Sequence, residues 1–389
     1  MENAEVLNPM IEQPAAGQKK KERPGLSRIV CIWLSIGVFM VFMQVVIGGI
    51  TRLTGSGLSI TKWEIVTGTL PPMNAAAWEH EFDLYKATPQ YQKINEGMTM
   101  GEFKFIYFWE YFHRLWARSM GFVFAIPFFI FLFRGMLDRR ITGQLLRVVG
   151  LAAIVASFGW IMVASGLIHR PWVNAYKLTI HLSLGITLFT YLLWITIEAW
   201  HRNGAWSDAT TKQRLISLQN QFPSWKKSML WIIGILSVQI LLGGLMSGMK
   251  AAVFYPSFPK MGEEWLPSVV FQAQNWTAEN FTNYDVTNFM PALVQLLHRS
   301  TAYVLTVLII VFAYKVRIQP NLPRVIQTGS LLILLALAGQ FLLGVLTLLY
   351  SKGTVPVGLG VMHQAGALVL FSVAWFLWYH LRRIPRLTS

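Results

Sequence analysis

Long apolar stretches alternate with polar segments along the chain. Eight of these stretches are about 20 residues long, the length that a helix needs to cross the hydrocarbon core of a bilayer. The pattern predicts an all-α integral membrane protein with eight transmembrane helices. The predicted spans are residues 27–48, 118–136, 144–166, 177–200, 227–248, 291–314, 326–350 and 358–380.

Short motifs recur in the same order in the first four and the last four spans. Their offsets are similar, at 195, 185, 180 and 182 residues. This regularity predicts a duplicated unit and therefore two tandem, pseudo-symmetric four-helix bundles. The matched motifs are QVVIGGI (44–50) with QILLGGL (239–245), EYFHRLWARSMGFVF (110–124) with VQLLHRSTAYVLTVL (294–308), GWIMVASGL (159–167) with GQFLLGVLT (339–347), and LTIHLSLGITLF (178–189) with GVMHQAGALVLF (360–371).

The distribution of basic residues predicts the orientation in the membrane. Lysine and arginine gather in the termini and short turns, whereas loop 49–112 carries five Lys/Arg against seven Asp/Glu and loop 249–290 carries two against four. By the positive-inside rule both termini are cytoplasmic and both long loops lie outside. The predicted parts are a disordered tail (1–26), an N-terminal half (27–200), a cytoplasmic linker (201–226), a C-terminal half (227–381) and a second tail (382–389).

Net charge and cysteine content exclude several classes of function. The net charge of +15 follows the membrane topology, so it is not the footprint of a nucleic-acid-binding surface. Cys31 is the sole cysteine, which excludes an intramolecular disulfide and a cysteine-based metal site.

Four of the eight histidines fall at matched positions in the two halves, at the outer ends of the predicted spans. Two imidazoles at one depth on neighbouring helices are suited to hold a flat iron porphyrin between them. The four candidates are His113 and His181 in the first half and His298 and His363 in the second. Gly121, Gly185 and Gly366 lie further inward and are predicted to leave room for the ring. His80, His169, His201 and His380 are predicted to have no ligand role.

Charged residues beside the histidines differ between the halves. Glu110 precedes His113 by three residues on roughly the same helix face, whereas Gln295 takes this place in the second half. The difference predicts different tasks, with Glu110 relaying protons or stabilising positive charge. A surface ion pair with Arg114 or Arg118 is the alternative. Candidate contacts for porphyrin propionates are Arg52, Arg114 and Arg299.

The outer loop after the first span carries the most specific pattern. Its segment GGITRLTGSGLSITKWEIVTGTLPPMN (48–74), continuing to residue 118, closely resembles haem A synthases of the branch shared by alphaproteobacteria and mitochondria. ASGLIHRPWVNAYKLTIHL (164–182) and LLHRSTAY (296–303) resemble the same family. Many bacterial relatives carry a cysteine pair in this loop. This chain lacks it, so an electron relay through loop thiols is excluded.

The resemblance implies a membrane enzyme that converts haem O to haem A for aa3-type cytochrome oxidase. The reaction would oxidise the C8 methyl group to a formyl group through two successive O2-dependent hydroxylations. His298 and His363 resemble the axial ligands of a resident haem b, His113 and His181 resemble the substrate-haem site, and Glu110 resembles the catalytic glutamate.

The resemblance also implies a location and partners. The expected location is the bacterial inner membrane, with the haem sites towards the periplasm. The implied partners are haem O and haem A, lipid, haem O synthase, oxidase assembly factors and an unidentified electron donor, and a homo-oligomer is left open. The segment 78–91 is expected to form a short surface helix over the site.

Two other functions fit parts of the pattern. A di-haem b electron-transfer protein of the quinol or cytochrome-b type also needs paired histidines, but it usually carries a ligand pair on one helix. A transporter also uses duplicated halves, but no span is interrupted at midplane and few charges lie within the spans. A haem O synthase is set aside because the chain has no DxxxD motif.

Overall fold

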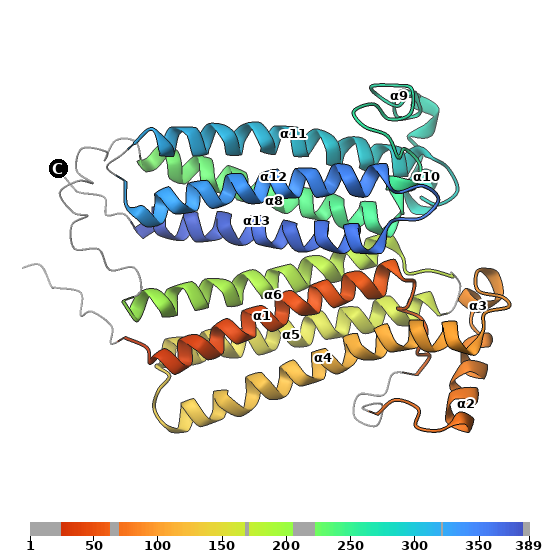
Figure 1. Cartoon of the computed structure of the whole chain (residues 1–389), viewed down its shortest axis with the longest axis horizontal. Helices are drawn as coiled ribbons and strands as arrows, with labels where there is room; N and C mark the ends of the chain where they lie inside the picture. Colours follow the sequence, from red (N-terminus) through yellow and green to blue (C-terminus); the bar gives the residue numbers. More distant parts are fainter. Residues whose placement is uncertain (1–24, 63–69, 168–170, 205–221, 320–321, 384–389) are drawn as a thin grey trace, which may run out of the picture.

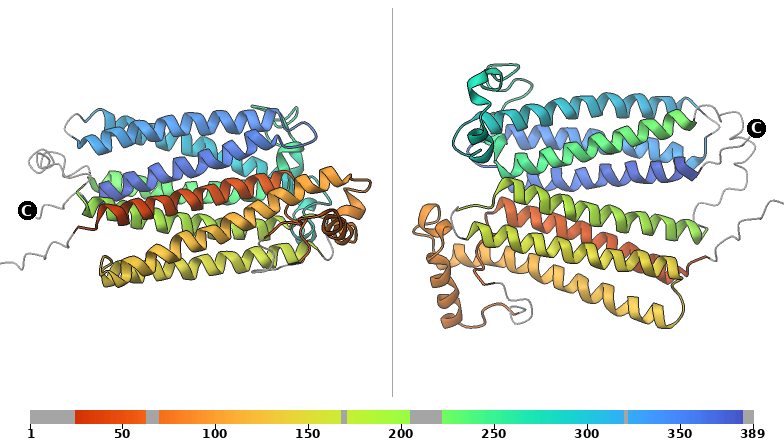
Figure 2. Two further views of the ribbon diagram at one scale, coloured as in Figure 1. Left: turned by 60° about the horizontal axis from the view of Figure 1, so that its bottom comes forward. Right: turned by 180° about the vertical axis from the view of Figure 1, so that it is seen from behind.

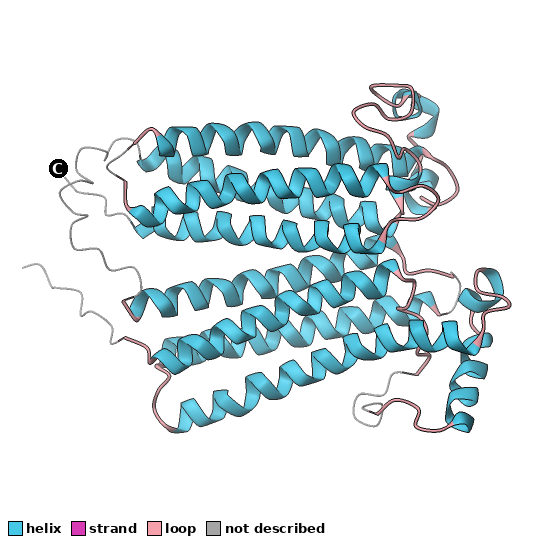
Figure 3. Cartoon of the chain, viewed as in Figure 1, coloured by secondary structure: helices cyan, strands magenta, loops and turns pink. Residues whose placement is uncertain are grey.

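The structure is a computed structural model that describes residues 25–62, 70–167, 171–204, 222–319 and 322–383. Within these ranges the chain forms helices and loops without a regular strand (Figure 3). Eight of the described helices are long and apolar enough to span a membrane, which confirms the predicted number. They are α1 (Arg28–Leu53), α4 (Met100–Phe133), α5 (Arg139–Gly166), α6 (Ala175–Arg202), α8 (Phe222–Gly248), α11 (Phe289–Arg317), α12 (Arg324–Leu349) and α13 (Val357–Arg383).

The eight spanning helices pack side by side in two groups (Figure 1). In one group α1 packs against α4 and α6, and α5 packs against α6; in the other, α11 packs against α8 and α12, and α13 packs against α8 and α12. Helices α1 and α6 of the first group meet α8 and α13 of the second. The arrangement is compatible with a duplicated four-helix bundle, and the duplication itself stays a prediction.

The ends of the bundle differ in what they carry. Helix α1 begins and α13 ends at the same end, whereas the two long connecting segments lie at the opposite end (Figure 2). An even number of spans requires this placement. We refer to the end with the long segments as the outer end; its periplasmic location stays a prediction.

Helix α4 begins much earlier than the predicted span, at Met100 rather than at residue 118. A capping box starts it: the Thr99 hydroxyl accepts from the Glu102 N–H, and the Glu102 carboxylate accepts from the Thr99 N–H at 2.8 Å. Its 34 residues extend about 50 Å, well beyond the ~30 Å hydrocarbon core. Glu110 and His113 therefore lie inside a continuous helix. The predicted span began later because hydropathy detects only the apolar part of α4.

Short helices cover the outer end. The segment expected to be helical at 78–91 forms two, α2 (Ala75–Lys86) and α3 (Pro89–Lys93). They pack on the outer part of α4 through an aromatic cluster in which Phe82 stacks on Phe103 at 4.8 Å between ring centroids. The second long segment forms η2 (Ala251–Val253), α9 (Ser268–Phe271), η3 (Ala273–Asn275) and α10 (Ala278–Thr282).

Close backbone approach joins the two groups at the outer end. The Arg52 guanidinium of α1 donates to the Ser247 and Gly248 carbonyls of α8, at 2.7 and 3.1 Å. Carbonyls in the last turn of a helix lack partners within that helix and favour a nearby positive charge. At Gly248 an added Cβ would lie 2.6 Å from the Cα of Ala175 on α6, so only glycine permits this contact.

We predict opposite effects of the same substitution at two glycines of α8. Gly248→Ala forces the two groups apart and lowers the free energy of unfolding by about 1–3 kcal/mol, the usual cost of overpacking. Gly234→Ala is the matched control, because its added methyl group meets no atom within 4 Å and alanine favours a helix by up to about 1 kcal/mol. Thermal unfolding in detergent measures both. An equal loss of stability in the two variants would contradict the role of Gly248.

Candidate functional site

In the first half, each of the two predicted histidines rests against a glycine of a neighbouring helix. His113 on α4 faces Gly48 of α1, where an added Cβ would lie 3.0 Å from the ring carbon Cε1. His181 on α6 faces Gly159 of α5 in the same way, at 2.9 Å. The helices that carry them, α4 and α6, both pack against α1. Both rings therefore lie within the first group of helices, each against a glycine of a neighbouring helix.

The second half repeats this arrangement. His298 on α11 faces Gly243 of α8 at 3.5 Å, and His363 on α13 faces Gly344 of α12 at 2.8 Å. The centroids of the two imidazole rings are 6.4 Å apart, and the ring planes are inclined by 77°. The structure thus brings His298 and His363 together at the outer end of the bundle, with His113 and His181 at the corresponding places of the first half.

The glycines that face the imidazole rings are not Gly121, Gly185 and Gly366, whose predicted role of leaving room for the porphyrin stays a prediction. Added Cβ atoms at Gly121 and Gly185 would meet nothing within 4 Å, and Gly366 faces Gln340. The four facing glycines are matched across the halves: Gly48 and Gly243 are 195 residues apart, and Gly159 and Gly344 are 185 apart. The GG doublet shared by QVVIGGI and QILLGGL was the available signal. For the third helix of each half, the motifs were matched at an offset of 180 residues, whereas the facing glycines are 185 residues apart. That match was therefore five residues out of register.

Two glutamines beside the histidines were also missed. The Nε2 atom of Gln44 on α1 lies 3.1 Å from Nε2 of His113, and Nε2 of Gln239 on α8 lies 3.2 Å from Nε2 of His298. Their spacing is again 195 residues. Each of these glutamines opens the shared QxxxGG motif, so one helix supplies both the space for a ring and a polar neighbour for it.

The histidine pairs fit an iron porphyrin. Two imidazoles on opposite sides of one metal ion, each about 2 Å from it, have centroids about 6 Å apart, close to the 6.4 Å of His298 and His363. The Nδ1 atoms of His181, His298 and His363 are buried without a hydrogen-bond partner, which is uncommon for polar atoms. The described residues hold no group of three metal-binding side chains. Two protein ligands per site suit haem iron, because the porphyrin supplies the other four.

A third histidine pair shows that ring separation alone does not define such a site. His201 and His380, at the inner ends of α6 and α13, also have centroids 6.4 Å apart. Among the described residues no glycine faces either ring, and aromatic side chains such as Tyr379 and Phe376 pack on them. The surroundings of this pair therefore differ from those of the other histidines, and its lack of a ligand role stays a prediction.

Glu110 is buried in α4 and anchors the start of the first outer loop. Its Oε2 atom accepts hydrogen bonds from the N–H and hydroxyl of Ser59, both at 2.8 Å, and from the N–H of Ile60 at 2.9 Å. Its Oε1 atom forms an ion pair with Arg114 at 2.5 Å. The alternative ion pair is therefore present, but it is buried rather than on the surface.

The three arginines predicted to contact propionates all bind backbone carbonyls. Arg52 binds the end of α8, as described above. Arg114 donates to the carbonyls of Ile60 and Lys62 at 3.3 and 3.1 Å. Arg299 donates to four carbonyls of the second outer loop, at 2.7–3.3 Å. Propionate contacts stay a prediction, whereas the visible role of these side chains is to hold backbone.

Comparison with known proteins gives this geometry its context. The family model for cytochrome oxidase assembly proteins matches residues 31–375. The haem A synthase of Nitrosospira multiformis is 35% identical, over 96% of this chain and 99% of the relative. That of Sinorhizobium fredii is 38% identical over 89% and 88%, and that of Flavobacterium psychrophilum is 37% identical over 90% and 97%.

The chain belongs to the haem A synthase family. This membership confirms the resemblance drawn from the outer loop. The placement in the cysteine-free branch of the haem A synthases stays a prediction.

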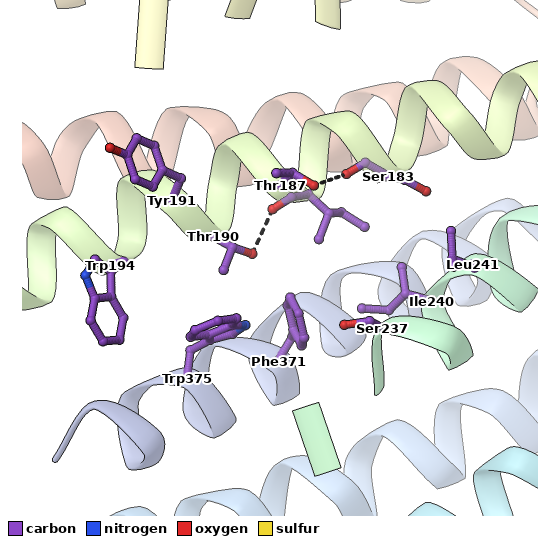
Figure 4. A pocket seen from close by; sticks show the side chains of 11 residues that line it. Ser183, Thr187, Thr190, Tyr191, Trp194, Ser237, Ile240, Leu241, Phe371 and Trp375 are labelled. Carbon is purple, nitrogen blue, oxygen red and sulfur yellow. Dashed lines mark hydrogen bonds between the residues drawn. The ribbon is translucent and has the colours of Figure 1, made fainter. Parts of the chain in front are cut away.

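A groove of about 460 Å³ lies between the two halves of this haem A synthase family member, and its lining includes no histidine (Figure 4). Ser183, Thr187 and Thr190 line it from the side of α6 that points away from His181. Their hydroxyls, and that of Ser237 on α8, donate to carbonyls of their own helices. The groove therefore offers mainly apolar and aromatic surface, including Trp194, Phe371 and Trp375, and we assign it no part in the histidine chemistry.

We predict that one facing glycine is required for haem binding and another glycine of the same helix is not. Gly344→Val places methyl groups where the His363 ring lies, at an overpacking cost of about 1–3 kcal/mol, so the haem retained by the second half falls to less than about half. Gly339→Val is the matched control, because no atom lies within 4 Å of its added Cβ. The haem-to-protein ratio and the low-spin optical spectrum measure the effect. Full haem content in Gly344→Val would refute it.

Proposed function

We propose that this chain is a haem A synthase that converts haem O to haem A for aa3-type cytochrome oxidase. Membership of the family supports a role in haem A biosynthesis. The observation that carries the proposal is the repeated pairing of a histidine with a facing glycine, four times at matched positions. The proposed reaction oxidises the C8 methyl group to a formyl group by two successive O2-dependent hydroxylations.

The two histidine pairs take different roles in this proposal. His298 and His363 would hold a resident haem b, and His113 and His181 would hold the substrate haem. When bound, haem b supplies a one-electron redox centre beside the substrate site. The chain contributes rigid placement, because α6 of the first half and α8 and α13 of the second pack directly against each other.

Glu110 is the proposed catalytic residue. It precedes His113 by three residues on roughly the same face of α4. Hydrogen bonds from Ser59 and Ile60 and the ion pair with Arg114 hold its carboxylate in place. A fixed negative charge there stabilises positive charge that develops at the edge of the substrate ring. Gln295, at the matched position, has no charge to offer, in keeping with a resident haem that is not itself converted.

The proposed setting is the bacterial inner membrane, with both termini in the cytoplasm and both haem sites towards the periplasm. The distribution of lysine and arginine supports this orientation. Lipid, haem O and haem A are the proposed molecular partners. Haem O synthase and oxidase assembly factors are proposed to act with the protein, and the electron donor is a further, unidentified partner.

Identification of the bound haems tests the function directly. We expect the purified protein to carry haem b together with haem O or haem A, as read by mass spectrometry of the extracted haems. Two permanent haems b, with no haem O or A after co-expression with a haem O source, would favour the di-haem electron-transfer protein instead. Purification without any bound haem would contradict both functions.

We predict that Glu110→Gln separates haem binding from conversion. The haem b content stays near that of the unmodified protein, while formation of haem A falls by at least about 100-fold, the usual range for a removed acid–base group. The alcohol product of the first oxidation accumulates. Glu102→Gln is the matched control, because it makes the same chemical change in the exposed first turn of α4. Chromatography of extracted haems gives the result, and normal haem A content in Glu110→Gln would exclude a catalytic role.

A further inference from the structure

The two outer loops are held to the bundle by the same device. Arg114 binds the carbonyls of Ile60 and Lys62, and Arg299 binds those of Tyr255 and Ser257, at 3.2 and 2.7 Å. Both pairs of carbonyls are 195 residues apart, the offset of α1 and α8, and the two arginines are 185 apart, the offset of the histidines that precede them. Corresponding side chains thus bind corresponding points of the two loops.

The starts of the two outer loops pack on the outer parts of the helices in their own half. In the first half Leu58 is 2% exposed and packs on Gly166 at the outer end of α5, where an added Cβ would meet it at 2.9 Å. Ser59 is fully buried against α4, next to Glu110. In the second half η2 contacts α8, α11 and α12. Each loop start therefore packs on the outer part of one histidine-bearing helix and of at least one neighbour, α4 with α5 in the first half and α11 with α8 and α12 in the second.

The attachment differs in charge between the halves. In the first half the carboxylate of Glu110 accepts from the loop N–H groups of Ser59 and Ile60 and also pairs with Arg114. In the second half the amide of Gln295 donates to the Tyr255 carbonyl at 2.9 Å. A carboxylate and an arginine therefore attach the first loop, whereas a neutral amide and an arginine attach the second.

We propose that Arg114 and Arg299 are matched positioning residues that close the two outer loops over the two histidine sites, and that Glu110 is part of the first of these attachments. In consequence, access to the His113–His181 site is set by the Glu110–Arg114 attachment, and access to the His298–His363 site by Arg299. Only the identity of the molecule that enters, a substrate haem, rests on the function proposed above.

Cysteine accessibility tests the attachment in the full-length protein. A Cys31→Ala background removes the sole cysteine. Ser56→Cys reports on the first loop and Ala251→Cys on the second; these positions are 195 residues apart, and both are 0% exposed. The rate of maleimide labelling is measured in lipid nanodiscs for each reporter.

The two arginine variants are expected to act on their own loops only. Arg114→Gln accelerates labelling at position 56 by about tenfold or more, because a charge-assisted hydrogen bond contributes about 1.5–3 kcal/mol, and it leaves position 251 unchanged. Arg299→Gln has the reverse effect. Unchanged labelling in both variants, or equal acceleration at both positions, would overturn the proposal.

Two further variants keep the test decisive. Ser59→Ala removes one donor to Glu110 without changing any charge, and it accelerates labelling at position 56 to a smaller extent; it replaces Arg114→Gln if that variant does not fold. Glu110→Gln also accelerates labelling at position 56. If Glu110→Gln leaves this rate unchanged, Glu110 has no positioning role.

A haem-transfer measurement separates this proposal from the proposed function. Transfer of haem to excess apomyoglobin is followed optically, and Arg114→Gln is expected to speed the loss of the first-half haem about tenfold while the haem of the second half is retained. Loop-specific labelling in a protein that binds no haem would support the attachments and refute the haem function. Bound haem with no loop-specific labelling would refute the attachments and support the haem function.

Discussion

Space for four imidazole rings between closely packed helices is the constraint on which the rest of the structure depends. Packed helices are usually about 8–10 Å apart at their axes, which leaves no room for a ring beside ordinary side chains. The structure meets this need with a glycine on the facing helix at each histidine, on α1, α5, α8 and α12. The pairing of helices within each half follows, because each ring-bearing helix needs a glycine-bearing neighbour at the same depth.

The outer end of the bundle has a different requirement, which is to satisfy loop backbone beside apolar helices. Loop carbonyls near the bilayer have few water partners, and an unpaired one is costly. Arginine suits this position, because its planar group carries several donors on a long stem. Arg52, Arg114 and Arg299 each bind two or more carbonyls. The three arginines, which the sequence suggests as ligands of anionic propionates, therefore also act as hydrogen-bond donors to backbone carbonyls.

The sequence predicted features that depend on local pattern and missed those that depend on distant contacts. Apolar runs gave the eight spans, and repeated motifs gave the histidine pairs. Hydropathy placed the start of α4 at residue 118, because the aromatic and charged turns from Met100 onward are supported by α2 and α3 rather than by lipid. The facing glycines were missed, since a ring's neighbour lies on another helix. Ser59 and Ile60 bind Glu110 from the loop, and they are some fifty residues away from it in sequence.

The contrast between Glu110 and Gln295 links loop structure to chemistry. The Glu110 carboxylate accepts three hydrogen bonds from the loop and pairs with Arg114. The contacts that attach the first loop therefore also keep a negative charge at a fixed place beside the first histidine pair. A charge that must act on a passing intermediate is most effective when it needs no rearrangement at the moment of reaction. One set of hydrogen bonds thus attaches the first loop and also holds in place the charge on which the proposed catalysis depends. The neutral amide of Gln295 attaches the second loop without supplying a charge.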